Sequence, residues 1–342
     1  MENHDLHGAA REGSFARLAA EQITLANLTA PNASGNTPLH LAAKYGSLRQ
    51  LPPAWLNQET LSLKNDAGYT AIHLAARTGH LLQVPPALLT RENLLRRSNS
   101  GYTALHQAAA AGSLDQVPPA LLDEDAVLTK TDHGNTLLHE AAEAGMLDRV
   151  PARFINRRTL TVANISGETV LHVAAFNGHL DQVPRELLTA ETLLTKTANH
   201  DTCLHAAAIS GHLDQIPAEL LTHDHLILAS KSGHTPIHAA AEAGHIDQIP
   251  RDRLTVDLLT SPNDLGDTPL HAAAVEGHLR EIPREFLTAA TMALRNYNGG
   301  TPLGAAIRHG HTAQVPPELL PKPPGLLKRI LYKIGASRPP FG

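Results

Sequence analysis

Hydrophobic and polar positions along the chain repeat every 33 residues. In each unit a short apolar run containing two alanines, such as Ala42-Ala43, precedes a glycine, and a leucine-rich half with a proline follows. Threonine keeps the same spacing without an insertion, at Thr37, Thr70, Thr103, Thr136, Thr169, Thr202, Thr235, Thr268 and Thr301. A period of this length predicts a solenoid of stacked units rather than two or three separate globular domains.

The first half of each unit carries the signals of a short helix. In the first complete unit, Thr37 is a favoured N-cap residue, and Pro38 fits the first helical position because no amide donor is needed there. Gly46 is a favoured residue for the end of a helix. The pattern therefore predicts a helix over Pro38–Tyr45, and the paired alanines give it a thin face against which a neighbouring helix can stack.

The second half of each unit contains a proline, which cannot lie inside a continuous helix because it lacks the amide donor. A second column of favoured N-cap residues follows, at Thr24, Asn57, Thr90, Asp123, Asn156, Thr189, Thr222, Thr255 and Thr288. We therefore expect two short helical turns in this half, for example residues 85–89 and 91–95, whose leucines complete the core.

The stretch from Gly35 to Ala43 reads Gly-Asn-Thr-Pro-Leu-His-Leu-Ala-Ala, which is the signature of the ankyrin repeat. The chain resembles the ankyrin-repeat family from residue 4 to about residue 320, in about ten copies. The resemblance implies an all-α fold, a curved solenoid of stacked helix-turn-helix units whose usual role is to bind other proteins. The proline in the second half departs from the longer second helix of the family.

The two ends of the array differ from its inner units, as end repeats that expose an otherwise buried face should. We expect residues 1–34 to form an N-terminal capping repeat and residues 35–320 the ankyrin-type solenoid. Residues 321–342 then form a Pro-rich linker and a basic amphipathic tail. At the C-terminal end, Gly304 replaces the column histidine and Pro321 replaces the cap threonine.

The tail has basic residues and no acidic one from Lys322 onward. Its apolar side chains share one face of a predicted helix, at Leu326, Leu327, Ile330, Leu331 and Ile334. One interpretation is a lid over the last unit. The other is a segment, residues 326–334, that contacts a membrane surface or a partner, which would make the protein a peripheral membrane adaptor. The sequence leaves both open.

Composition narrows the function classes. The chain is 42% hydrophobic with a formal net charge of -5, which excludes wholesale disorder and argues against general nucleic-acid binding. The single cysteine, Cys203, cannot form an internal disulfide, and from the pattern we expect neither a secretory leader nor a membrane span. We expect a monomeric cytoplasmic protein.

The chain has 22 histidines, most of them at repeat positions. Equivalent atoms of stacked helices lie about 8 to 10 Å apart, whereas ligands of one zinc ion each lie about 2 Å from it, so a column of histidines cannot chelate a metal. The resemblance implies instead that one column hydrogen-bonds between adjoining turns. This structural column is His40, His73, His106, His139, His172, His205, His238 and His271.

Candidate chemistry outside that column is sparse. The pairs His223 with His225, and His4 with His7, offer two metal ligands at most, whereas structural sites use four. Cys203 lies beside His205, a column residue, which argues against a catalytic pair. We expect no cofactor, no metal and no catalysis; a metal-dependent protein that uses the remaining histidines is the rival hypothesis.

Residues that bind a partner should occupy the positions that the repeat leaves variable. By the resemblance, the residue before the threonine and the two after the paired alanines line the concave face. The candidates are Tyr69, Arg77, Tyr102, Glu143, Phe176, Ile209 and Glu242. Tyrosine and arginine are common interface anchors, although Phe176 and Ile209 could instead cover helix faces. Acids in the later units, Glu168, Asp201, Glu242 and Asp267, suit a basic partner segment.

Overall fold

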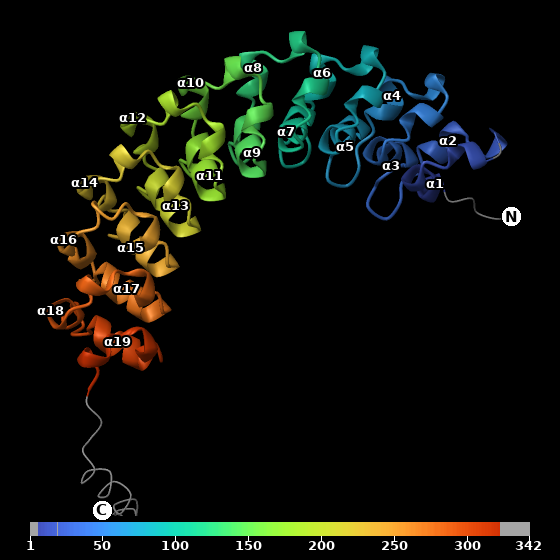
Figure 1. The fold of residues 1–342 in the computed structure, drawn as a ribbon. Helices are drawn as coiled ribbons and strands as arrows, with labels where there is room; N and C mark the ends of the chain where they lie inside the picture. The colour runs from blue at the N-terminus through green and yellow to red at the C-terminus, as the bar shows by residue number, and fades with distance from the viewer. Residues whose placement is uncertain (1–5, 19, 322–342) are drawn as a thin grey trace, which may run out of the picture.

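The computed structural model describes residues 6–18 and 20–321, which form one curved array of helices (Figure 1). In this part of the chain no strand occurs, and the one isolated β-bridge joins Ala163 and Thr169. The odd-numbered helices lie along the concave side of the array and the even-numbered helices along the convex side (Figure 1). The all-helical stacked fold expected from the sequence is confirmed.

Each inner helix packs against the inner helices before and after it. The inner helices are α1 Leu6–Glu12, α3 Pro38–Tyr45, α5 Ala71–Arg77, α7 Ala104–Ala110, α9 Leu137–Ala144, α11 Val170–Asn177, α13 Cys203–Ser210, α15 Pro236–Ala243, α17 Pro269–Glu276 and α19 Pro302–Arg308. The outer helices are α2 Leu25–Leu28, α4 Gln58–Leu61, α6 Arg91–Leu95, α8 Glu124–Val127, α10 Arg157–Leu160, α12 Ala190–Leu193, α14 His223–Leu226, α16 Val256–Thr260 and α18 Ala289–Met292.

The predicted first helix, Pro38–Tyr45, is confirmed as α3 with the same bounds. The side-chain oxygen of Thr37 accepts a hydrogen bond from the backbone N–H of His40, 3.3 Å away, which satisfies one of the free amides at the helix start. Gly46 ends the helix with φ of 74°, a left-handed conformation that favours glycine.

The second half of each unit is a chain of short turns. In the unit that contains α5, a 3-10 turn at Pro86–Leu88 precedes α6. Thr90 caps α6 by accepting a hydrogen bond from the backbone N–H of Asn93 at 3.2 Å. Both predicted turns are present. A further 3-10 turn, Leu81–Gln83, lies between the inner helix and the proline, and the hydrophobic pattern does not predict it.

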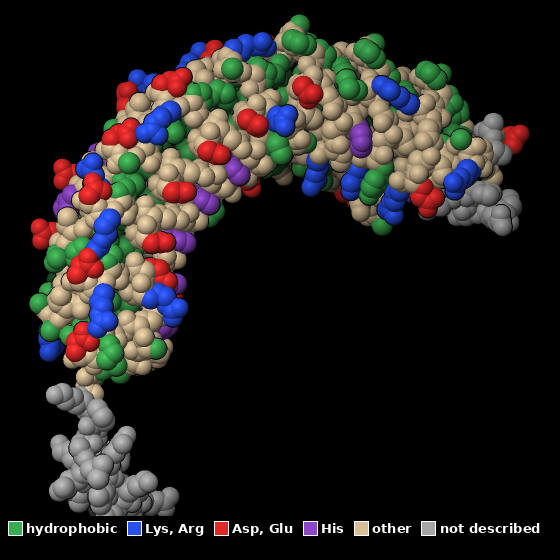
Figure 2. Space-filling model, viewed as in Figure 1, with side chains coloured by type: hydrophobic (Ala, Val, Ile, Leu, Met, Phe, Trp, Pro, Cys, Tyr) green, Lys and Arg blue, Asp and Glu red, His purple; other side chains and the backbone are tan. Residues whose placement is uncertain are grey.

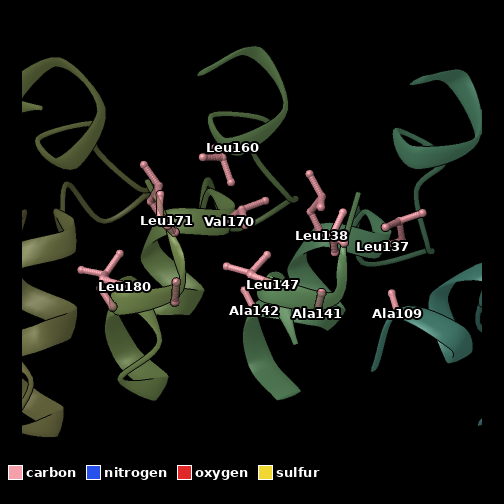
Figure 3. Close-up of a cluster of buried hydrophobic side chains, with 14 of the residues drawn as sticks. Ala109, Leu137, Leu138, Ala141, Ala142, Leu147, Leu160, Val170, Leu171 and Leu180 are labelled. Carbon is pink, nitrogen blue, oxygen red and sulfur yellow. The ribbon is translucent and has the colours of Figure 1, made fainter. Parts of the chain in front are cut away.

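Leucines from both halves of a unit fill the core between the two layers of helices. Figure 3 shows Leu160 of the outer helix α10 above Val170 and Leu171 of α11, and all three side chains are buried. Ala141 and Ala142 are fully buried in α9, beside the next inner helix. Their small side chains let neighbouring inner helices approach closely, so the stack places equivalent concave residues side by side.

The predicted boundaries at residues 34 and 320 stay predictions. The tail hypotheses for residues 326–334, and the His4 position, fall outside the described residues. Among the residues described, no helix is both long and apolar enough to cross a membrane.

Candidate functional site

A column of buried histidines joins each inner helix to the turn of the next unit. His106 Nδ1 lies 2.8 Å from Thr103 Oγ1, and His106 Nε2 lies 3.2 Å from the carbonyl oxygen of Asn135. The same two contacts, to the N-cap threonine and to a carbonyl of the following unit, occur at His40, His73, His139, His172, His205, His238 and His271.

The partners of these rings define their protonation. The carbonyl of Asn135 can only accept, so His106 Nε2 carries the proton, and the backbone N–H of Thr103 donates to Nδ1 at 3.3 Å. Burial lowers the pKa of His106 to about 4, and the carbonyl hydrogen bonds offset only part of this desolvation. Burial lowers the pKa of His73, His139 and His238 to about 4 as well. These rings are therefore neutral at pH 7.

A groove of about 490 Å³ lies over α9, α11 and α13 on the concave side. The inner helices contribute its apolar lining, which includes Val173, Phe176 and Ile209. Phe176 and Ile209 are each 52% exposed, although both side chains are large and apolar. They lie at equivalent positions of the neighbouring helices α11 and α13, so they form one apolar surface.

The turns between units contribute the polar lining of this groove. Glu168 and Asp201 come from successive turns, and Glu143 comes from the end of α9. The column residues His172 and His205 lie where helix and turn meet, because each imidazole contacts a carbonyl oxygen of the next turn. The groove thus has an acidic turn side and a helical side that is apolar at Phe176 and Ile209 and acidic at Glu143.

Comparison with known protein families agrees with this architecture. The family "Ankyrin repeats (3 copies)" matches residues 48–132, 138–216 and 171–249, and "Ankyrin repeat" matches residues 34–51. The chain belongs to the ankyrin-repeat family. It has no significant match among curated protein sequences. Ankyrin repeats are in general protein–protein interaction modules and are typically non-catalytic.

Charge is distributed unevenly over the ankyrin array. Figure 2 shows Lys and Arg side chains along the inner edge of the N-terminal half, and Asp, Glu and His side chains along the inner edge of the C-terminal half, with further Lys or Arg side chains near its end. Within residues 6–18 and 20–321, none of the groove carboxylates Glu143, Glu168 and Asp201 forms an ion pair. Glu168 accepts a hydrogen bond from Asn164 Nδ2 at 2.9 Å.

The structure brings together only some of the predicted binding residues. Glu143, Phe176 and Ile209 line the groove. Tyr69, Arg77 and Tyr102 lie nearer the N-terminus and do not line it.

The two tyrosines are half-buried and lie against the histidine column. The Tyr69 ring centre is 5.6 Å from that of His73, and the Tyr102 ring centre is 6.0 Å from that of His106. Arg77 is exposed at the end of α5.

Glu242 lies in a second, smaller groove. This groove has a volume of about 210 Å³, and Asp267 and Glu276 also line it. Glu242 Oε2 is 3.1 Å from His234 Nε2. Of the predicted acids, Glu168 and Asp201 therefore belong to the first groove, and Glu242 and Asp267 to the second.

Sequence reasoning missed a buried carboxyl at Glu140, which is only 7% exposed. Asn135 Nδ2 donates to Glu140 Oε1 at 3.2 Å. Burial raises the pKa of Glu140 to about 7. The signal was present: the equivalent positions of the three earlier units are all buried and hold Leu41, Leu74 and Gln107.

Two histidines outside the column, His223 and His225, and the single cysteine show no arrangement typical of a catalytic or metal site. His225 Nδ1 donates to the carbonyl oxygen of Leu220 at 2.8 Å, and His223 lies beside Asp224. In the part of the chain that is described, no group of three or more His, Cys, Asp or Glu side chains is placed to hold a metal ion. Cys203 is fully buried, and burial raises the pKa of its thiol, which disfavours a nucleophilic thiolate.

Proposed function

We propose that this ankyrin-repeat protein is a non-catalytic scaffold that binds another protein through its concave face. One observation carries the proposal: Phe176 and Ile209 are each half exposed on adjacent inner helices, within one groove. Large apolar side chains that stay exposed beside each other, with polar groups at the rim, are typical of interaction surfaces. The wider candidate surface includes Tyr69, Arg77, Tyr102, Glu143 and Glu242.

The competing interpretation, that Phe176 and Ile209 cover helix faces, predicts side chains largely hidden by their neighbours. The paired alanines directly before them do fit that role, because Ala174, Ala175, Ala207 and Ala208 are fully buried. Phe176 and Ile209 follow these alanines and leave half of their surface to solvent. A partner that covered both would remove about 25 cal/mol of unfavourable exposure for each Å² of apolar surface buried.

The test is a quantitative pull-down from the lysate of the source cells with the full chain. The binding variant combines Tyr69→Ala, Arg77→Ala, Tyr102→Ala and Phe176→Ala. The matched control combines Leu25→Ala and Val256→Ala, which remove exposed apolar side chains from the outer helices α2 and α16. Far-UV circular dichroism checks that both variants keep the helicity of the wild type.

We expect a protein that the wild type and the outer-helix control capture and that the concave variant loses. Equal capture by all three chains would contradict the proposal, because the binding residues would then lie outside the concave face.

A further inference from the structure

We propose that the groove over α11 and α13 binds an extended segment of a partner protein that has Lys or Arg along one edge and large apolar residues along the other. This inference rests on the proposed function and names the chemistry of the partner. Two independent observations support it: the ion pairing of acids on the two faces of the array, and the division of the groove lining between helices and turns.

Several acidic side chains on the convex side pair with an arginine of the preceding unit. Glu219 pairs with Arg185 at 3.1 Å, Glu318 with Arg284 at 3.0 Å, and Glu191 with Arg157, each across one unit boundary. Glu143, Glu168 and Asp201 in the groove have no such partner, and no Lys or Arg lines the groove. The groove on the concave side therefore carries negative charge that no Lys or Arg of the described residues pairs with. A ligand with Lys or Arg side chains would supply the missing partners.

The column histidines do not neutralise this charge. Burial lowers the pKa of His172 and His205, and lowers that of His139 to about 4. These three rings line the groove as neutral hydrogen-bonding groups at pH 7, because each donates Nε2–H to a turn carbonyl and accepts at Nδ1 from its N-cap threonine. The three carboxylates therefore give the groove a negative charge.

The two sides of the groove match the two edges of an extended peptide. Phe176 and Ile209 come from helices, whereas Glu168 and Asp201 come from turns. Successive side chains of an extended chain point in opposite directions, so alternate residues would meet the apolar side and the acidic side. From α9 to α13 the array advances by two helix spacings of about 8 to 10 Å each, which an extended segment covers with about five or six residues.

The N-terminal half of the concave face would reject such a segment. Lys44 and Arg77 follow the paired alanines of α3 and α5, at the positions that Phe176 and Ile209 occupy in α11 and α13. These two cations would repel the Lys or Arg side chains of the segment, which disfavours its binding to this half of the face. The change from cations to carboxylates along the face therefore gives the partner a defined position and direction.

The probe is a fluorescein-labelled octapeptide with alternating Arg and Leu residues, titrated with the full chain and followed by fluorescence anisotropy at two salt concentrations. Control peptides replace every Arg with Glu or every Leu with Ser. Two groove variants, Glu168→Gln with Asp201→Asn and Phe176→Ala with Ile209→Ala, are compared with a convex-face charge control, Glu186→Gln with Asp224→Asn. Both residues of that control are exposed.

We expect the Arg-Leu peptide to bind at least tenfold more tightly than either control peptide. The carboxylate variant should lose about tenfold in affinity and most of the salt dependence, the apolar variant should lose affinity but keep the salt dependence, and the convex-face control should match the wild type. Equal loss in the groove and convex-face variants would overturn the inference, because binding would then follow net charge alone.

The chain's own basic segment is a rival occupant, and a further full-chain variant separates it from a partner. Lys328→Glu, Arg329→Glu and Lys333→Glu should leave the affinity for the Arg-Leu peptide unchanged. A several-fold gain in affinity would show that residues 326–334 occupy the groove and would overturn a partner segment as the occupant. Absence of peptide binding, together with a protein captured only by an intact concave face, would reject this inference and leave the proposed function in place.

Discussion

His106 Nε2 lies 3.2 Å from the carbonyl oxygen of Asn135, so one side chain joins two units of the stack. The ring is neutral because burial lowers its pKa to about 4. Protonation would place a second N–H at Nδ1, directly opposite the backbone N–H of Thr103, 3.3 Å away. Acid therefore acts on the contact between units at His106, and at His73, His139 and His238, whose pKa burial also lowers to about 4.

The first prediction concerns the pH dependence of stability. The unfolded chain binds a proton at each histidine near pH 6.5, whereas His73, His106, His139 and His238 in the folded chain bind one only near pH 4. The free energy of unfolding should be constant above pH 6.5 with respect to these groups and should fall as pH drops from 6.5 toward 4. At pH 5 the loss is about 2 kcal/mol for each histidine. Urea unfolding at pH 7.5 and pH 5 measures it.

A pair of variants assigns that loss to the column. His106→Gln should destabilise the protein at pH 7.5 and should reduce the change in stability between pH 7.5 and pH 5. His133→Gln, at an exposed turn position, removes a histidine without removing a bond between units and should keep the wild-type pH dependence. Identical pH profiles for the two variants would rule out the column as the cause.

The sequence predicts much of this fold because every unit repeats the same local signals. Thr37, Pro38 and Gly46 fix the bounds of α3, and Thr90 marks the start of α6. The structure of one 33-residue unit therefore predicts the whole array, because a contact that forms in one unit forms again in the others. The 3-10 turn at Leu81–Gln83 was not predicted, because three residues have no hydrophobic period and this turn, unlike that at Pro86–Leu88, contains no proline to mark it.

The candidate site was less accessible to sequence reasoning. The period places Phe176 and Ile209 on one face, but it cannot show that Glu168 and Asp201 lie in the same groove as these two while Tyr102 does not. That depends on how turns and helices meet in three dimensions. The repeat does mark the position of Glu140 as buried, but it does not show that the carboxyl accepts a hydrogen bond from Asn135 of the preceding turn.

The second prediction concerns the close approach of successive units at Gly178. This residue ends α11 with φ of 75°, and a Cβ built there would lie 2.6 Å from the His212 ring of the next unit. Gly178→Ala should therefore cost the left-handed backbone energy of about 1 to 2 kcal/mol and a steric penalty in addition. Gly310→Ala is the matched control, because Gly310 has φ of 83° and no atom within 4 Å of its Cβ position. Chemical denaturation should rank Gly178→Ala below Gly310→Ala; equal losses would show that the ring moves aside freely.

The third prediction concerns the only non-glycine residue with positive φ in the described part of the chain, His200. Its φ of 67° occurs where neighbouring units have Gly167 and Gly233. His200→Gly should relieve backbone strain and stabilise the protein by up to about 1 kcal/mol. His133→Gly should have the opposite sign, about 0.5 to 1 kcal/mol of destabilisation. His133 has no backbone strain to relieve, so the glycine only raises the conformational entropy of the unfolded chain. Thermal unfolding of the two variants checks the signs, and destabilisation by both would show that the His200 side chain makes a contact that matters more than the strain.

The fourth prediction concerns the buried carboxyl of Glu140. Burial raises the pKa of Glu140 to about 7 in the folded chain, whereas the unfolded chain ionises near 4.5, so ionisation of Glu140 lowers stability as pH rises from 4.5 through 7. This penalty is about 2.5 kcal/mol larger at pH 8 than at pH 5. Glu140→Gln keeps the shape and an oxygen that can accept from Asn135 Nδ2, so it should stabilise the protein at pH 8 and have much less effect at pH 5.

The histidine contribution cancels when Glu140→Gln and the wild type are compared at the same pH, because both chains carry the same column. The neighbouring Glu143, which is exposed, raises the pKa of Glu140 only through its charge, so Glu143→Gln should produce a smaller stabilisation in the same direction. If Glu140→Gln instead destabilised the protein equally at both pH values, the carboxylate would be acting as a required acceptor for Asn135 Nδ2. The buried carboxyl would then stabilise the fold at all pH values, because its hydrogen bond with Asn135 would hold the turn before α9 in place.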